Sequence, residues 1–228
     1  MTISQASPAQ MPSTNPVLDF LIDLRTTAWR TAGARYNAAR RLRRRESFST
    51  VSLALFSTSS IAVTFIQRIY SPQAGTPLDN YLTTLLASLG VFLLTISLLE
   101  WGAAYGAKAE ALHRNAEELT AYQFKLKQVL AESIATGIVD SAKIDQLRVE
   151  YEGIKGRCGY NHDPRDDLLF RAARRLAPEF LDSEDAPVIG AKRALLIKMG
   201  WHLSTVWYFA LFWLVIFGAF AYAWHVPK

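Results

Sequence analysis

Hydrophobic residues are concentrated in three stretches of this 228-residue chain, at positions 50–66, 81–104 and 202–224. The three stretches contain no Lys or Arg, and Glu100 is their only acidic residue. An α-helix needs about 20 apolar residues to cross the ~30 Å hydrocarbon core of a bilayer, where a charged side chain costs roughly 2.5–3.5 kcal/mol. The pattern therefore predicts three membrane-spanning helices. The first two cover residues 50–67 and 81–104, and residues 201–228 contain the third span and a short tail outside the membrane.

The first predicted span is shorter and richer in hydroxyl groups than the other two. Residues 68–80 separate it from the second span and include the turn-forming sequence SPQAGTP. This short loop predicts a helical hairpin, in which neighbouring spans give hydroxyl groups partners other than lipid. The third span carries Trp201 and Trp207 near one end and Tyr222 near the other, a distribution typical of membrane interfaces.

The more polar regions predict further helices. Residues 17–48 place apolar side chains at intervals of three and four, the pattern of an amphipathic helix that can continue into the first span. The apolar positions are Val17, Phe20, Leu21, Leu24, Ala28, Ala32, Tyr36 and Ala39. Residues 105–200 predict a helical bundle, with Gly137 ending one helix and Asp163 and Pro164 starting another. The predicted fold class is all-α: a transmembrane hairpin extended by a helical bundle, plus a third C-terminal transmembrane helix.

Residues 1–16 are rich in Ser, Pro, Gln and Thr and carry no charged side chain. They lack the basic segment and apolar run of a signal peptide, so we expect a disordered tail.

Cys158 is the only cysteine, which excludes an intrachain disulfide and fits a reduced cytosolic setting. A single thiol can be reactive, but it is more often a small apolar filler.

Basic residues define the expected orientation. Of 25 Lys and Arg, only Arg68 and Lys228 lie on the far side of the predicted topology. The positive-inside rule then places the N-terminus and the bundle in the cytoplasm and the C-terminus outside. The basic residues closest to the membrane form a patch of Arg40, Arg41, Arg43, Arg44 and Arg45. We interpret this patch as a collar facing membrane lipids. Direct nucleic-acid binding is the less favoured alternative.

The sequence contains no phosphate-binding glycine loop, no dinucleotide fingerprint, no HExxH and no paired CxxC. We therefore predict no catalytic residues, no metal site and no cofactor, and we do not expect an enzyme. The richest polar segment is a turn after the second bundle helix, with Tyr160, Asn161, His162, Asp163 and Asp166. It fits a capped loop between two helices, and the alternatives are acid–base chemistry or a loop that senses a ligand or partner.

A polar stripe follows the predicted hairpin. At 100° per residue its members on the first span fall within about a third of the helix circumference. They are Thr50, Ser57, Ser60, Thr64 and Gln67, joined on the second span by Ser88 and Glu100. The stripe fits hydrogen bonding within the hairpin or the water-facing wall of an oligomeric pore. Glu100 lies near the predicted cytoplasmic end, where Arg45 could pair with it across the hairpin.

Three segments together resemble a known family. RYNAARRLRRRESF precedes the first span, EWGAAYGAKAEALHRNAEELTAYQFKL continues from the second, and YEGIKGRCGYNHDPRDD follows in the bundle. This organisation is similar to the SLATT proteins, two-span bacterial membrane effectors. Within the family, Asn161, His162 and Asp166 resemble a motif of the branch found beside reverse transcriptases. The third span is a departure from the two-span form.

The resemblance implies an effector that disrupts or perforates the inner membrane of a bacterium in antiphage abortive infection. Our leading interpretation is that this effector is a homo-oligomer. The resemblance also implies a nearby partner such as a reverse transcriptase or a nucleotide-signalling protein, and no catalytic residues. A different class is also open: a membrane scaffold that recruits a nucleic-acid-bearing partner through the arginine-rich helix.

Overall fold

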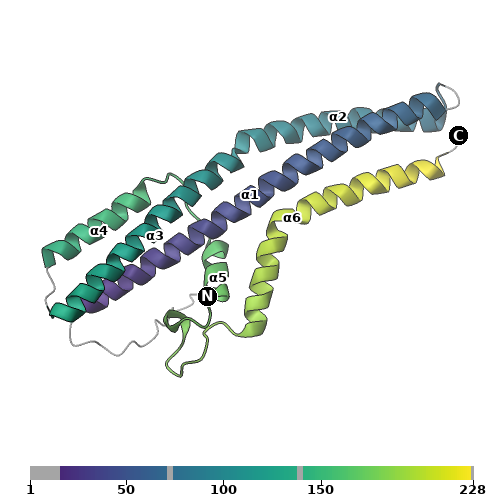
Figure 1. The fold of residues 1–228 in the computed structure, drawn as a ribbon. Helices are drawn as coiled ribbons and strands as arrows, with labels where there is room; N and C mark the ends of the chain where they lie inside the picture. The colour runs from purple at the N-terminus through teal and green to yellow at the C-terminus, as the bar shows by residue number, and fades with distance from the viewer. Residues whose placement is uncertain (1–15, 71–73, 138–140, 227–228) are drawn as a thin grey trace, which may run out of the picture. The chain divides into compact units, whose positions relative to one another are not determined.

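The computed structural model describes residues 16–70, 74–137 and 141–226. This part of the chain is helical and contains no strand, which confirms the all-α prediction. The helices are α1 (Pro16–Tyr70), α2 (Pro77–Ala103), α3 (Tyr105–Thr136), α4 (Ser141–Gly156), α5 (Pro164–Ala173) and α6 (Ala191–Tyr222), with short 3-10 turns η1 (Pro178–Phe180) and η2 (Ala223–His225) (Figure 1). The tail expected at residues 1–16 lies almost entirely outside the described residues.

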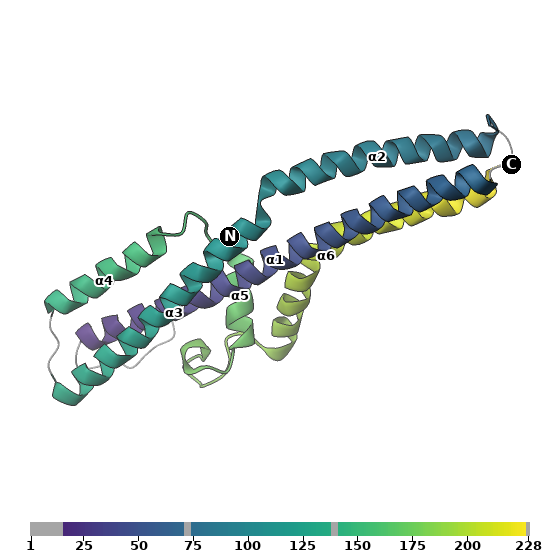
Figure 2. The same cartoon turned by 45° about the horizontal axis from the view of Figure 1, so that its top comes forward.

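The chain divides into two compact units. The bundle unit contains Met1–Arg41 and Ala107–His202, and the membrane unit contains Leu42–Gly106 and Leu203–Lys228. Three helices, α1, α3 and α6, have residues in both units. Because α1 is one uninterrupted helix, the basic segment and the first predicted span are continuous, as the absence of proline allowed (Figure 2).

The apolar stripe of α1 forms the main core of the bundle unit with α3 and α4. This core contains Leu21, Leu24, Ala28, Ala32, Leu119, Tyr122, Leu126, Val129, Leu147, Tyr151 and Ile154, all buried. The Tyr122 hydroxyl donates to the Leu147 carbonyl oxygen at 2.6 Å, so the polar end of this buried ring is satisfied. Phe20 was expected on the buried stripe, but its side chain is exposed.

Two helix boundaries follow from local chemistry. Gly137 has φ +68°, and its N–H donates to the Ser133 carbonyl oxygen at 3.0 Å, which ends α3 as predicted. Asp163 accepts from the backbone N–H of Arg165, and Asp166 accepts from the N–H of Asp163. Together with Pro164 in the first turn, this capping box starts α5 where the sequence predicted.

The membrane unit has a small core and an apolar exterior. Phe56 of α1, Leu89 of α2 and Ile216 of α6 form its buried centre. Many large apolar side chains point outward instead; Leu94 and Leu214, for example, are 63% and 70% exposed. Water would disfavour such a surface, whereas lipid suits it. The three predicted spans thus correspond to three long helices that are apolar enough to cross a bilayer, and the protein is a membrane protein.

In the bundle unit, α5 packs against α1 through aromatic rings. The ring of Phe170 meets Trp29 edge-on at 5.0 Å and Phe180 of η1 at 6.2 Å. Gly33 of α1 lies directly beneath Phe170, and a Cβ at this position would overlap its ring. Glycine at position 33 therefore permits the close approach of α5 to α1.

We predict that Gly33→Ala destabilises the bundle unit by about 1–3 kcal/mol, because the ring of Phe170 has to move within a packed core. Thermal unfolding in detergent, followed by circular dichroism, measures the effect. Gly153→Ala is the matched control, since a Cβ at Gly153 of α4 meets no atom within 4 Å. This control should be neutral or stabilising by up to ~1 kcal/mol, and equal melting temperatures for both variants would contradict the prediction.

Candidate functional site

A buried carboxylate lies at the centre of the bundle unit's polar contacts. The side chain of Asp166, in the first turn of α5, is fully buried. Arg41 of α1 binds it with two hydrogen bonds, from Nε to Oδ1 at 3.0 Å and from Nη2 to Oδ2 at 2.9 Å. Trp201 of α6 donates from Nε1 to Oδ1 at 2.8 Å, and the N–H of Asp163 donates to Oδ2 at 3.1 Å. We call these residues, with Asn37, the Asp166 junction.

Asn37 connects α1 to α5 a second time. Its Nδ2 donates to the backbone carbonyl oxygen of Asp166 at 2.8 Å, in a buried position. Asn37 and Arg41 are four residues apart on α1, so they lie on one face and meet the first turn of α5 together. A single residue of α5 is thereby tied to α1, to α6 and to its own N-cap.

The junction compensates the charge of Asp166 and satisfies both of its oxygens. Each Asp166 oxygen accepts two hydrogen bonds, which fills the acceptor positions of a carboxylate. Burial alone would lower the pKa of Arg41, but its hydrogen bonds and charge interaction with Asp166 outweigh burial and raise that pKa. Of the interpretations open from the sequence, the capped turn between helices matches the capping box at Asp163 and Asp166.

A pocket of about 490 Å³ opens beside this turn. Its walls are Thr27, Arg30, Thr31, Asn161, His162, Pro164 and Asp167. Arg30 donates to Asp167 at 3.1 Å across it. Within the described part of the chain, Nδ1 of His162 is buried without a hydrogen-bond partner. Two residues of the predicted sensing loop, Asn161 and His162, therefore line a hollow with an unused polar atom.

The structure divides the predicted basic patch. Arg41 belongs to the Asp166 junction, whereas Arg45 donates to Glu100 at 3.3 Å and stacks on the Tyr105 ring at 4.1 Å. The expected Arg45–Glu100 pair is thus present within the membrane unit. Arg40 is exposed, and Arg43 and Arg44 make contacts of their own. Successive residues turn 100° around a helix, so a run of five arginines faces several different environments.

The polar stripe is also divided. Gln67 donates to Asp79 Oδ1 at 2.7 Å and to Thr83 Oγ1 at 2.9 Å, which joins the outer ends of α1 and α2. Ser60 is half-buried and Glu100 pairs with Arg45, whereas the remaining stripe positions are exposed in the single chain. These exposed positions are Thr50, Ser57, Thr64 and Ser88.

Two groups of residues were not recognised from the sequence. Ser49 and Ser52 are buried in the membrane unit, and Ser52 accepts a hydrogen bond from Trp213 Nε1 at 3.3 Å. Ser49, Ser52 and Phe56 are spaced by three and four residues, and this spacing was the available sign that they share one face of the helix. The pairing of Arg41 and Trp201 with Asp166 spans 125 and 35 residues, and no local pattern indicates it.

These features define an all-α integral membrane protein whose polar bundle is organised by a buried ion pair. Residues 18–222 match the model of SMODS and SLOG-associating 2TM effector domain family 5. The chain therefore belongs to the SLATT family of membrane effectors, which confirms the resemblance seen in the sequence. The match continues to residue 222 and so includes α6, the third apolar helix. Neither the curated proteins nor the solved structures yielded a significant match.

We predict that Asp166→Asn destabilises the bundle unit strongly, because it leaves the Arg41 guanidinium without its counter-charge. Removing one partner of a buried pair costs about 3–5 kcal/mol; Arg41 is 25% exposed, so the loss should fall below the upper end of that range. Asp167→Asn is the control: its pair with Arg30 is more exposed, and such pairs contribute about 0–1 kcal/mol. Comparable loss of thermal stability in both variants would refute the special role of Asp166.

We predict an acid-sensitive stability linked to His162. Burial lowers the pKa of His162 below its ordinary value of 6.5, with Arg35 acting in the same direction and Asp167 opposing it. The folded chain therefore binds this proton less readily than the unfolded chain. Stability should fall as the pH drops below about 6.5 and level off below the folded-state pKa. Melting temperatures across this range should fall less steeply for His162→Gln; an unchanged slope would contradict the assignment.

Proposed function

We propose that this protein is an oligomeric, non-enzymatic membrane effector whose bundle unit responds to a cytoplasmic signal by changing the packing of the transmembrane helices, which opens a leak in the membrane. The observation that carries this proposal is the exposure of Thr50, Ser57 and Thr64 along one line of a helix whose other outward positions in the span are mostly apolar. Membership of an effector family supports the membrane-directed activity.

The exposed hydroxyls can tolerate two environments. Thr64 donates to the Ser60 carbonyl oxygen of its own helix at 2.8 Å, so its hydroxyl is satisfied in lipid. Residues seven apart on a helix lie about 20° apart, so Thr50, Ser57 and Thr64 form one continuous line. Hairpin contacts such as Gln67 with Asp79 use other positions. In an assembly of several copies this line can face water and form a pore wall.

The Asp166 junction could couple the pocket of the bundle unit to the transmembrane helices. It ties α5 to Arg41 of α1 and Trp201 of α6, and both helices continue into the predicted spans. A ligand or partner that enters the pocket at Asn161 and His162 would contact the loop that positions Asp166. Any differential binding there biases the arrangement of the two helices.

The proposed orientation places the bundle unit in the cytoplasm of a bacterium and the C-terminus outside, because most Lys and Arg lie in that unit or next to it. Exposed Arg40 is then available to anionic lipid headgroups. A soluble signal, a reverse transcriptase or a nucleotide-signalling protein would reach the pocket from the cytoplasm.

We predict that the full-length protein, reconstituted in liposomes, releases an encapsulated dye, and that Ser57→Ala combined with Thr64→Val lowers the release rate severalfold by removing hydroxyls from the pore wall. Thr58→Val is the matched control. Thr58 is also exposed and bonds its own helix at 2.9 Å, but it lies about 120° away from Thr64 around the helix. Release by the control should equal that of the wild type.

Equal reduction by both variants would argue against a pore wall formed by this line. Complete absence of release, together with tight RNA binding that is lost in Arg40→Gln, would favour the scaffold function instead. A strictly monomeric state in detergent and in liposomes would also contradict the proposal, because one hairpin cannot enclose a channel.

A further inference from the structure

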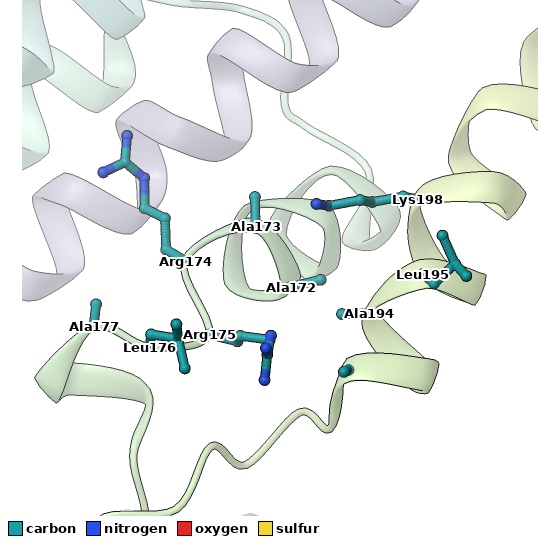
Figure 3. A pocket seen from close by; sticks show the side chains of 10 residues that line it. Ala172, Ala173, Arg174, Arg175, Leu176, Ala177, Ala194, Leu195 and Lys198 are labelled. Carbon is teal, nitrogen blue, oxygen red and sulfur yellow. The ribbon is translucent and has the colours of Figure 1, made fainter.

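A second pocket of about 600 Å³ lies within the bundle unit, between the end of α5 and the start of α6 (Figure 3). One wall is formed by the last residues of α5 and the turn that follows it, and the other by the first two turns of α6. The lining residues are Ala172, Ala173, Arg174, Arg175, Leu176, Ala177, Ala191, Ala194, Leu195 and Lys198.

The pocket is cationic. Its lining includes three basic residues and no acidic residue. Arg174 points away from the opening in Figure 3, and its guanidinium stacks over the rings of Trp29 and Phe170 at 5.1 Å each. Arg175 and Lys198 extend from opposite walls, and neither forms an ion pair with any residue that the structure describes. Two uncompensated cations across one hollow favour an anionic ligand.

The rim of the pocket is apolar. Leu176 and Leu195, both in the lining, are 67% and 59% exposed. Leu196 and Met199 of α6 are also more than half exposed. A soluble anion would gain no binding energy from this apolar surface. A lipid offers both an anionic headgroup for the cations and apolar chains for the rim.

The position of the pocket in the sequence fits the same ligand. Lys198 lies four residues before His202, where the apolar part of α6 begins. At 1.5 Å per residue this is about 6 Å along the helix. A basic residue so close to a span is within reach of the lipid phosphates.

We propose that Arg175 and Lys198 bind the phosphate group of an anionic phospholipid, with Leu176 and Leu195 against its glycerol and acyl region. The pocket is separate from the hollow at His162, and the proposal depends on the membrane location alone, not on leak activity. Binding would hold the start of α6 against the turn that follows α5.

The test is native mass spectrometry of the full chain in detergent with added phosphatidylglycerol or phosphatidylcholine. Each cation near an anionic lipid surface contributes roughly fivefold in affinity. Arg175→Gln combined with Lys198→Gln should therefore weaken phosphatidylglycerol binding by about 25-fold and leave phosphatidylcholine binding unchanged. Lys127→Gln combined with Arg148→Gln removes two exposed cations of the same unit elsewhere and should leave both unchanged.

Two results would overturn the proposal. Equal weakening in both double variants would mean general charge attraction and no site. Displacement of the lipid by millimolar glycerol phosphate at equal affinity would assign the pocket to a soluble phosphate ligand. Circular dichroism and an unchanged melting temperature establish that the variants are folded. Leu195→Ser keeps both cations and should still weaken phosphatidylglycerol binding, because it removes an apolar contact.

Discussion

The buried ion pair between Asp166 and Arg41 is the interaction on which the bundle unit depends. A fully buried carboxylate is tolerated only when its charge is compensated and its oxygens are hydrogen-bonded. Arg41, Trp201 and the backbone of Asp163 meet these requirements from three different segments. The same contacts that satisfy the charge therefore fix α5 between α1 and α6. Since α5 is only ten residues long, it could not hold this position by its own helical stability.

The membrane unit follows a different physical rule. Its core is small and its exterior is apolar, because lipid removes the need to bury hydrophobic surface. Specific contacts then come from polar atoms between helices, such as Ser52 with Trp213 and Gln67 with Asp79. Arg45 and Glu100 add an ion pair. The exposed hydroxyls of Thr50, Ser57 and Thr64 take no part in these contacts, which makes them available to neighbouring copies or to water.

These two rules bear on the proposed coupling between the bundle unit and the transmembrane helices. Polar clusters with demanding geometry have discrete arrangements, and a ligand that favours one of them shifts the population. The pocket at His162 lies against the turn that carries Asp166, and the pocket at Arg175 and Lys198 lies against the start of α6. In these two proposals, signal and lipid would act at two different places in the segment between residues 160 and 198.

The sequence by itself determined the three apolar helices, the helical bundle, the ends of two helices at Gly137 and Asp163, and the family. These features arise from composition and from interactions within a few residues, which a linear pattern records. The pairing of Arg45 with Glu100 was also expected from the sequence. Only the tertiary structure decided that Arg41 and Trp201 bind Asp166, and that Gln67 faces α2 while Thr64 faces outward. Helical rotation decides which way Gln67 and Thr64 face, and contacts between residues 125 and 35 positions apart place Arg41 and Trp201 on Asp166. Neither leaves a local signal in the chain.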